Sequence, residues 1–317
     1  AIVTVADDGG SSGRLRNEMG VLPPGDLRMA LSALCDDTDW GRTWSDVLQH
    51  RFSAPEGHTG EFPLDYHALG NLLIVTLWEL LGDPVAGLDW VGALLNARGR
   101  VLPMALEPLV IQGIVLREHG GAFERVQVRG QVNLAHEPQV HNIELVPAQA
   151  RACPEALASI EEADWVVLGP GSWRTSVLPH LLLREQREAL STTNAKRCVV
   201  MNLALDDKES NGLDASAHLK LLQQYAPNLR LDVVIADPSN MGVQSEFEDA
   251  ARELGAKVLW ASVRSQTRMC TTHSSWLQRT MICLLCVYKT LRTQLRHTRD
   301  THAHERGYLP CPPLRAG

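Results

Sequence analysis

Residues 164–172 read Asp-Trp-Val-Val-Leu-Gly-Pro-Gly-Ser, and this stretch decides the fold class. Its first five residues form a short, nearly continuous apolar run, which is typical of a strand covered on both faces of a parallel sheet. The Gly-Pro-Gly-Ser turn and the helix predicted after it point backbone N–H groups and a positive helix end at the carboxyl edge of that sheet. This arrangement favours an anionic ligand, and the alternative is a tight turn with a purely structural role.

Helical and strand-like segments alternate over most of the chain, as a parallel sheet with crossover helices requires. Strands are predicted at residues 109–116, 125–133, 141–146, 164–168, 197–202, 231–236 and 257–261. Helices are predicted at residues 26–35, 64–81, 86–97, 154–162, 175–190, 214–225 and 244–254. We therefore expect an α/β, Rossmann-like, doubly wound and mostly parallel sheet over residues 1–262.

Residues 101–147 depart from this pattern. Within them, the stretch 126–132 reads Val-Gln-Val-Arg-Gly-Gln-Val and alternates apolar and polar residues around a glycine. Such alternation is typical of a half-exposed antiparallel hairpin. We expect a small antiparallel insert that lies on the main sheet.

The chain opens on Ala-Ile-Val-Thr-Val-Ala at residues 1–6, a β-branched run that reads as a strand already in progress. An α/β nucleotide-binding domain usually opens with a strand, a Gly-rich turn and a helix. The expectation is therefore that a first strand and its Gly-rich loop are missing before Ala1.

Two carboxylates and a predicted Gly/Ser loop follow this strand. Carboxylates can accept from ribose or base groups, glycines permit close approach of a phosphate, and serine hydroxyls can bond its oxygens. An ordinary turn, in which Asp caps and Gly relieves strain, is the alternative. The ligand-binding residues predicted here are Asp7, Asp8, Gly9, Gly10, Ser11 and Ser12.

Two predicted helices supply further candidates. The stretch 23–28, Pro-Pro-Gly-Asp-Leu-Arg, predicts a stiff turn with Asp26 as N-cap. Arg28 then lies in the first helical turn, where it holds a phosphate or pairs with a nearby carboxylate. His67 and Asn71 lie one helical turn apart, so they contact a ligand or form a satisfied polar pair at a helix crossing. The predicted ligand site is completed by Arg28, Asn71 and the turn residues Gly169, Gly171 and Ser172.

The sequence shows no local signature of catalysis or of a metal site. It contains no nucleophile elbow and no His-Glu-x-x-His helix, and the turn at 169–172 lacks the lysine of a P-loop. No catalytic residue and no metal ligand is therefore predicted.

Composition and charge exclude several classes of protein. The 317 residues are 44% hydrophobic with a formal net charge of −7, which argues against a general nucleic-acid or anionic-membrane binder. The longest apolar stretch, residues 69–81, contains Gly70, Asn71 and Glu79 and is too short to span a bilayer. Seven irregularly spaced cysteines do not form a disulfide framework, so a reducing cytoplasm is the expected compartment.

The pattern of strands and helices fails after about residue 263. From Arg264 to Gly317 there are nine Lys or Arg against two acidic residues, and the tail holds four of the seven cysteines. It has no sustained helical or strand period, which resembles translation in a shifted reading frame more than an evolved domain. We expect residues 263–317 to be an aberrant, disordered basic tail; a genuine basic interaction tail is the alternative.

Four ordered motifs together carry a resemblance to a known family. The residues are Val-Ala-Asp-Asp-Gly-Gly-Ser-Ser-Gly-Arg-Leu-Arg at 5–16, Pro-Pro-Gly-Asp-Leu-Arg at 23–28, His-Ala-Leu-Gly-Asn-Leu-Leu at 67–73, and Leu-Gly-Pro-Gly-Ser at 168–172 followed by Thr-Ser-Val-Leu-Pro. They resemble the gluconeogenesis factor (YvcK-type) family, which looks related to 2-phospho-L-lactate transferase. The resemblance spans residues 1 to about 262.

This resemblance implies a cytoplasmic factor needed for growth and cell shape on gluconeogenic carbon. It also implies a nucleotide ligand, such as a UDP-sugar (UDP-N-acetylglucosamine) or an NAD-like dinucleotide. Its implied partner is a cell-wall precursor enzyme, with a homo-oligomer left open. One rival is a phosphotransferase of the 2-phospho-L-lactate type, in which Asp7 or Asp8 would coordinate a divalent metal. The other rival is a non-functional, truncated and frame-shifted product.

Three departures from the family pattern stand out. The Gly-Gly-Gly-x-Gly loop that the resemblance implies before Ala1 is absent from the sequence. Arg174 stands where the resemblance implies an aromatic residue. The family's C-terminal helix, expected after a strand such as 257–261, is replaced by the basic tail.

Overall fold

A four-stranded parallel sheet organises the C-terminal half of the chain. The computed structural model describes residues 1–119, 122–137, 139–202, 214–238 and 242–261. Its main sheet has the order β6-β7-β8-β9. The strands are β6 (Trp165–Leu168), β7 (Lys196–Val200), β8 (Val233–Ala236) and β9 (Lys257–Trp260). All four lie where the apolar runs predict strands.

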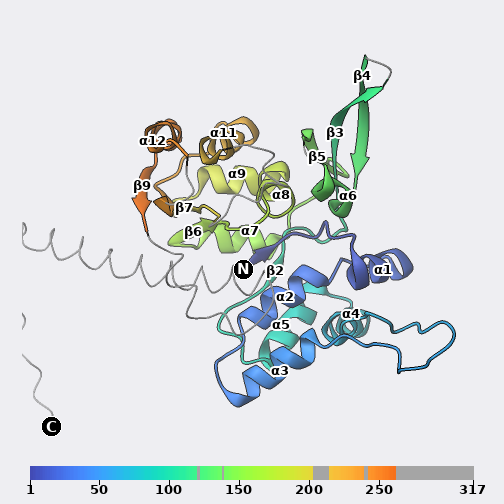
Figure 1. Ribbon diagram of the computed structural model, residues 1–317. Helices are drawn as coiled ribbons and strands as arrows, with labels where there is room; N and C mark the ends of the chain where they lie inside the picture. The colour runs from blue at the N-terminus through green and yellow to red at the C-terminus, as the bar shows by residue number, and fades with distance from the viewer. Residues whose placement is uncertain (120–121, 138, 203–213, 239–241, 262–317) are drawn as a thin grey trace, which may run out of the picture.

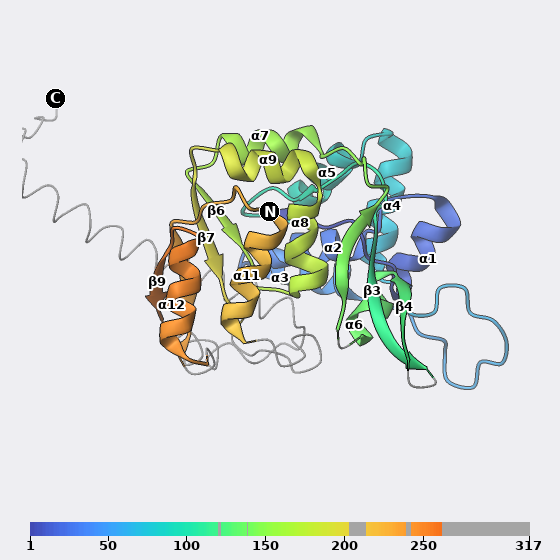
Figure 2. The same cartoon turned by 90° about the horizontal axis from the view of Figure 1, so that it is seen from above.

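Helices alternate with these strands and pack mainly on one side of them. α9, α11 and α12 lie together on one side of β7, β8 and β9, while α7 lies beside α9 (Figures 1 and 2). The helices are α7 (Pro154–Glu161), α8 (Leu178–Leu182), α9 (Arg184–Thr192), α11 (Ala215–Tyr225) and α12 (Gln244–Glu253). Parallel strands joined through helices confirm the Rossmann-like α/β prediction.

The N-terminal half is mostly helical and is tied to a short parallel pair of strands. β1 (Ile2–Val3) pairs with β2 (Leu102–Pro103), and the backbone of Val5 accepts a further bond from Leu109. The strand predicted over 1–6 is thus shorter than expected. Around this pair lie α1 (Gly10–Met19), α2 (Gly25–Ala33), α3 (Asp39–Gln49), α4 (Leu69–Leu81) and α5 (Pro84–Leu94).

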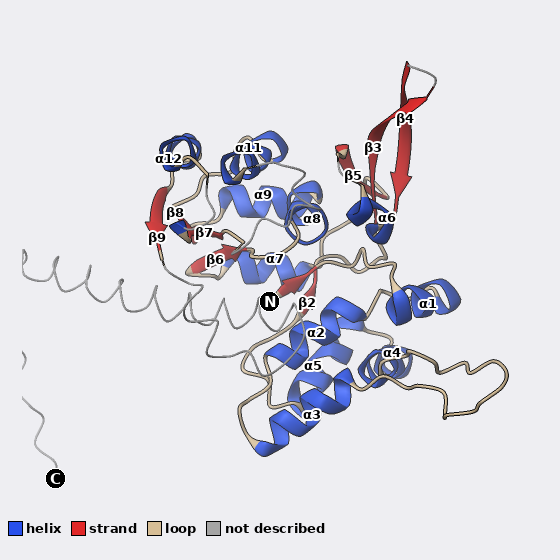
Figure 3. Cartoon of the chain, viewed as in Figure 1, coloured by secondary structure: helices blue, strands red, loops and turns tan. Residues whose placement is uncertain are grey.

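The predicted antiparallel insert is present and joins the two halves. Its sheet has the order β4-β3-β5, and β3 and β4 form a long hairpin that projects from the body (Figure 3). The elements are β3 (Val110–His119), β4 (Ala122–Arg129), α6 (Gln131–His136) and β5 (His141–Val146). The strand predicted over 125–133 is wrong at its end, because Gly130 has a φ of 96° and a short helix follows it.

Other predictions need correction. Helices α1 and α3 were missed, because α1 is rich in Gly and Ser and both have few regularly spaced apolar residues. The helix predicted over 175–190 is divided into η1 (Trp173–Val177), a π-helical turn, followed by α8 and α9. The strand at 164–168 is not covered on both faces, because Val167 is 39% exposed.

Some expectations lie outside the described residues. They include a missing first strand and Gly-rich loop before Ala1, and a basic tail over 263–317 with its four cysteines. Within the described residues, no helix is both long and apolar enough to cross a membrane.

We predict that Gly70→Ala lowers stability by about 1–3 kcal/mol, because overpacking a filled position forces side chains and backbone to move. A Cβ at Gly70 would lie 2.8 Å from the Leu48 carbonyl oxygen and 2.9 Å from Arg28 Cδ. The matched control is Gly92→Ala in α5, where the nearest atom would be 3.8 Å away. Gly92→Ala should raise the free energy of unfolding by about 0.5–1 kcal/mol, because alanine has a higher helix propensity than glycine. Thermal melts of both variants check the pair, and equal destabilisation would contradict this packing.

Candidate functional site

The predicted Gly/Ser loop after β1 is the first turn of a helix. α1 begins at Gly10, which has a φ of 47°, so Ser11 and Ser12 lie within its first turn. Gly13 allows the first turn of α1 to pack directly against the Asp8 backbone, because a Cβ at this position would lie 2.1 Å from the Asp8 carbonyl oxygen. The prediction of a loop is therefore wrong, although the exposed N–H groups that motivated it belong equally to a helix N-terminus.

Two serine hydroxyls bring the N-termini of three helices together. Ser11 Oγ accepts from Asn71 Nδ2 of α4 at 3.0 Å and from the Ala68 backbone N–H at 3.4 Å. Ser12 Oγ accepts from the Gly25 N–H at the start of α2 at 3.0 Å. The starts of α1, α2 and α4 consequently converge on the pair Ser11 and Ser12, and their positive dipole ends add there.

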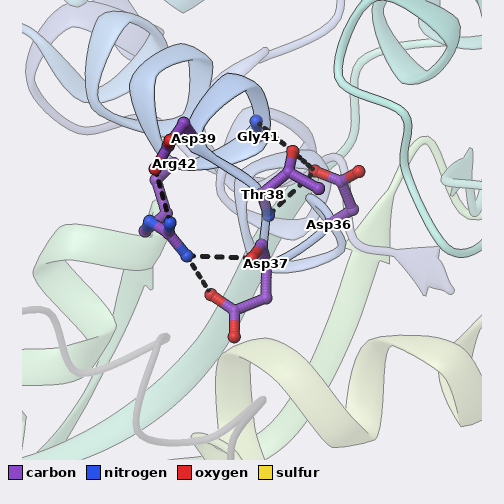
Figure 4. Close-up of polar contacts among 6 residues, drawn as sticks. All are labelled: Asp36, Asp37, Thr38, Asp39, Gly41 and Arg42. Atoms are coloured by element: carbon purple, nitrogen blue, oxygen red, sulfur yellow. Dashed lines mark hydrogen bonds and ion pairs between the residues drawn. The ribbon is translucent and has the colours of Figure 1, made fainter.

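None of these three helix N-termini has a side-chain cap. Their N-cap residues are Gly9, Pro24 and Ala68, and no side chain of these residues accepts from the first turn. Among the other described helices, α3, α5, η1 and α11 have a side-chain cap, whereas α6, α7, α8, α9 and α12 have none. Figure 4 shows the cap of α3, where Thr38 Oγ1 accepts from the Gly41 N–H at 3.1 Å. Uncapped first turns leave donors for an anion, so this junction has the geometry of an anion site.

The Ser11 hydroxyl also fixes the state of His67. Ser11 Oγ lies 3.0 Å from His67 Nδ1 and already accepts two hydrogen bonds, so its own proton is the one available to Nδ1. His67 is therefore a neutral imidazole that carries its proton on Nε2. Burial, followed by the charge of Arg14, lowers the pKa of His67, in agreement with this assignment.

Two polar atoms in the same region are buried without a partner. Asn71 is 1% exposed and its Oδ1 has no hydrogen bond, and Arg28 is 2% exposed with an unpartnered Nε. Arg28 does donate from Nη1 to Gln49 Oε1 at 2.6 Å, yet it forms no ion pair within the described residues. Burial lowers the pKa of Arg28 to about 10. An unpaired buried guanidinium is costly, and a bound anion would offset that cost.

Further arginines gather around the three N-termini without ion pairs in the described part of the chain. Arg14 donates to the Asp65 carbonyl oxygen, Arg51 to the Tyr66 carbonyl oxygen at 2.9 Å, and Arg16 to the Asp7 carbonyl oxygen at 3.5 Å. Arg129 of β4 lies close enough to Arg16 to lower its pKa, although burial has the larger effect. Together with Arg28 these residues form what we call the arginine collar: Arg14, Arg16, Arg28, Arg51 and Arg129.

Two carboxyl groups lie inside the arginine collar and repel one another. Asp7 Oδ1 accepts from the Gly9 N–H at 2.9 Å, and burial raises the pKa of this carboxyl. Asp26 accepts from Thr4 Oγ1 at 3.4 Å, and burial together with the charge of Asp7 raises its pKa to about 7. The sequence predicts Asp26 as the N-cap of α2, and this is wrong. The N-cap is Pro24, and Asp26 lies in the first turn of α2. Near neutral pH this carboxyl pair can take up or release a proton.

Asp8 has a different place from its neighbour. Its Oδ1 accepts from the Val132 N–H at 3.0 Å, in the first turn of α6, and Gly130 leaves the space that the other oxygen needs. Asp8 therefore ties the start of α1 to the antiparallel insert. The structure gives this carboxylate a protein partner, whereas the sequence prediction gave it a ligand.

The turn at residues 169–172 lies at the end of β6, as predicted. Gly171 and Asn202 exchange two hydrogen bonds of 2.9 Å, and Ser172 Oγ accepts from the Thr175 N–H at 3.3 Å as the N-cap of η1. Arg174 is buried and donates to the Glu137 carbonyl oxygen at 2.6 Å. The turn thus contacts the end of α6, whereas Asp8 holds the start of α6.

The structure brings together most of the predicted ligand residues but not all of them. Hydrogen bonds of the backbone or side chains connect Asp7, Gly9, Ser11, Ser12 and Asn71 with the N-termini of α1, α2 and α4, and Arg28 lies among them. Gly10 begins α1 beside them. Within the described residues, no hydrogen bond links Gly169, Gly171 or Ser172 to this group, and α6 lies between.

Sequence reasoning missed Asp26 as a titratable group, Asn202, and four members of the arginine collar. Asn202 could have been found, because it is the last residue of the strand predicted over 197–202 and so lies at the same sheet edge as Gly171. The arginine collar could not have been found from the sequence, because Arg51 and Arg129 are far along the chain from residues 14–28. Among the described residues, no group of three or more His, Cys, Asp or Glu could hold a metal ion.

Comparison with known proteins places the chain in a family. The family described as 2-phospho-L-lactate transferase CofD matches residues 1–267, and the chain belongs to this family. A protein of Mycobacterium leprae named "Putative gluconeogenesis factor" is 45% identical over 264 residues, covering 83% of this chain and 71% of that protein. The "Gluconeogenesis factor" of Bacillus subtilis is 35% identical over 255 residues, covering 79% and 75%.

A solved structure supports the same assignment. The crystal structure of a UPF0052-family protein from Bacillus halodurans matches with a TM-score of 0.69 and 30% identity. The match covers 83% of this chain and 84% of that one. The resemblance to the gluconeogenesis factor family and the Rossmann-like fold are thereby confirmed.

We predict that Asp26→Asn raises the melting temperature more at pH 8 than at pH 5. The folded pKa of about 7 exceeds the unfolded value of 3.8, so the stability that protonated Asp26 contributes is complete below pH 3.8 and is lost progressively between pH 3.8 and pH 7. Asparagine keeps a neutral side chain at every pH and so avoids this loss. The exposed Asp46→Asn serves as the matched control, and scanning calorimetry at both pH values checks the difference. A gain that is equal at pH 5 and pH 8 would refute the raised pKa.

Proposed function

We propose that the chain binds a nucleotide diphosphate ligand, a UDP-sugar, at the convergent N-termini of α1, α2 and α4. The observation that carries this proposal is that three uncapped helix N-termini and the arginine collar surround one junction. Helix N-termini and unpaired arginines both favour phosphate oxygens. A diphosphate supplies two adjacent anionic groups and so suits several donors better than a single carboxylate.

The orphaned acceptor in the same region supports a ligand that also donates hydrogen bonds. Asn71 Oδ1 is buried without a partner, so binding a hydroxyl or amide N–H group there removes a desolvation cost. Sugar hydroxyls and the acetamido group of UDP-N-acetylglucosamine carry such donors. An NAD-like dinucleotide also has a diphosphate and hydroxyl groups, and it is the ligand to test beside UDP-sugars.

The biological role proposed for this site follows from the family. We propose a cytoplasmic, non-catalytic factor that senses nucleotide-sugar supply and supports growth and cell shape under gluconeogenic conditions. A cell-wall precursor enzyme is the partner that this role calls for. The related proteins named gluconeogenesis factors support the coarse role, and the carboxyl pair gives the ligand response a dependence on pH.

A phosphotransferase of the 2-phospho-L-lactate type is the second candidate, and it rests on the family match. Such an enzyme would use Asp7 with Asp26 to hold a divalent cation near a phosphate. The partner that Asp8 already has in α6 favours the binding role, because it removes one carboxylate from a metal site. Release of phosphate or transfer of a phosphoryl group in the presence of Mg²⁺ would distinguish the two.

We predict that UDP-N-acetylglucosamine binds with a micromolar constant, equivalent to about −8 kcal/mol. Arg14→Gln and Arg129→Gln should each weaken binding by about 1.5 kcal/mol, roughly tenfold, because each removes a charged donor from the collar. The matched control is Arg42→Gln, because Arg42 is already paired with Asp37 and Asp39 at 2.7 Å (Figure 4). Isothermal titration calorimetry measures all four proteins.

Two results would count against this function. The absence of heat with millimolar UDP-sugars and with NAD would remove the nucleotide ligand. Equal weakening by Arg42→Gln would show a general charge effect and would leave the collar without a specific role.

A further inference from the structure

Strand β4 forms an open edge of the antiparallel insert. The sheet has the order β4-β3-β5 and its hairpin projects from the body, so no described strand lies beyond β4 (Figures 1 and 3). The Gly130 N–H donates to the Ile111 carbonyl oxygen at 2.8 Å, and this bond sets the alternation along the strand. In an antiparallel pair, residues bonded to the neighbouring strand alternate with residues whose N–H and C=O groups point away from it. The N–H groups that point away from β3 belong to Phe123, Arg125, Gln127 and Arg129.

These outward-pointing groups have few partners within the described part of the chain. The Arg129 carbonyl oxygen accepts from Asn133 Nδ2 at 2.8 Å, whereas no described hydrogen bond uses the outward groups of Phe123, Arg125 or Gln127. A proline, a lysine or a bulge commonly protects such an edge. β4 contains neither proline nor lysine, and its pairing with β3 is continuous. We call residues 123–129 the β4 edge.

The solvent-facing side chains of the β4 edge are apolar at one end and cationic along the rest. Phe123 is 73% exposed, and Leu116 of β3, its diagonal neighbour on the same face, is 48% exposed. Arg125 lies opposite Leu116, and Arg129 lies four residues further along the same row. Neither arginine forms an ion pair with a described residue, although Glu118 lies opposite Phe123. A locally cationic row on a chain with a net charge of −7 indicates a ligand that is itself acidic.

We propose that the β4 edge binds an extended acidic segment of a partner protein, which adds a strand to the insert. The outward N–H and C=O groups supply the main-chain hydrogen bonds, and the exposed side chains select the sequence. Side chains of the added strand on the solvent face lie opposite Phe123, Arg125 and Arg129, so an apolar residue and two carboxylates fit these positions. Arg125 lies outside the arginine collar, so this inference can be tested separately from the nucleotide site.

A second copy of this chain fits the β4 edge less well than an acidic partner. A two-fold axis perpendicular to a continuous sheet keeps the two solvent faces on the same side, so residues of the cationic row oppose each other. Pairing centred on Arg125 places this arginine opposite itself, and pairing centred on Gln127 places Arg125 opposite Arg129, which is destabilising. Because the row contains no acidic residue, no such pairing gives either arginine a carboxylate opposite it.

The first test uses two peptides and a charge reversal. The probe is the dye-labelled, amidated heptapeptide Glu-Val-Thr-Val-Glu-Lys-Phe, which in antiparallel pairing places its glutamates opposite Arg129 and Arg125 and its phenylalanine opposite Phe123. The control peptide has lysine in place of both glutamates. In fluorescence anisotropy, the probe should bind about fivefold or more tightly than the control, because two exposed ion pairs contribute roughly this ratio.

Arg125→Glu should reduce or reverse this preference, because it places like charges opposite each other in the complex with the probe. The matched control is Arg98→Glu, at an exposed arginine outside the insert, and it should leave the preference unchanged. Equal binding of the two peptides to the unchanged protein, or no binding of the probe at millimolar concentration, would overturn the proposal.

Amide hydrogen exchange, measured by NMR, tests whether the probe adds a strand and needs no variant. The probe should slow exchange at Phe123, Arg125 and Gln127, whose N–H groups point away from β3. Exchange at Val126 should change little, because its N–H is already bonded to β3. A bound probe that leaves the first three amides unprotected would overturn strand addition. Protection of these amides that rises with protein concentration in the absence of peptide would overturn the proposal in favour of a second copy.

Discussion

The hydroxyl of Ser11 is the contact on which the candidate site depends. It accepts from Asn71 and from the Ala68 backbone, and its own proton goes to His67. This one group therefore fixes the start of α4 against the start of α1 and fixes the tautomer of His67. Because Ser12 beside it accepts from the first N–H of α2, two consecutive residues align three helices whose dipoles would otherwise repel one another. Such an arrangement costs free energy in the empty protein and is offset when an anion binds.

The surrounding charges fit this reading. The described arginines that form ion pairs lie elsewhere on the surface, such as Arg42 and Arg100, where exposed pairs contribute little. Four members of the arginine collar, Arg14, Arg16, Arg28 and Arg51, instead donate to backbone carbonyl or side-chain amide oxygens. Asp7 and Asp26 supply negative charge inside it, and burial raises the pKa of both carboxyl groups. The pKa of Asp26, about 7, reduces that charge near neutral pH. The site is therefore positive enough for a diphosphate although the whole chain carries a net charge of −7.

Much of this architecture could be predicted from the sequence, for identifiable physical reasons. Strands of a buried parallel sheet have sequences that are short apolar runs, so the sequence predicts all four strands of the main sheet. The alternation of apolar and polar residues at 126–132 predicts the antiparallel insert. The sequence does not predict helix α1, because its first residues are Gly and Ser, which have low helix propensity. Gly13 is there because the start of the helix packs closely against the Asp8 backbone. Ser11, Ser12 and Asn71 were predicted as ligand residues and lie at one junction, and their role toward a ligand stays a prediction. The contact of Asp8 with Val132 could not be predicted, because Val132 lies 124 residues away. The arginine collar likewise depends on tertiary contacts, which no local pattern encodes.

The central claim is that an anionic nucleotide ligand binds where the N-termini of α1, α2 and α4 meet, and amide chemical shifts test it most directly. Each of these helices has a glycine in its first turn: Gly10, Gly25 and Gly70. With selective ¹⁵N-glycine labelling, titration with UDP-N-acetylglucosamine should shift all three amide signals together. Gly87, in α5 with its Asp83 cap, should not shift. Saturable binding that leaves Gly10, Gly25 and Gly70 unchanged would contradict the account, because the ligand would then bind elsewhere on the chain.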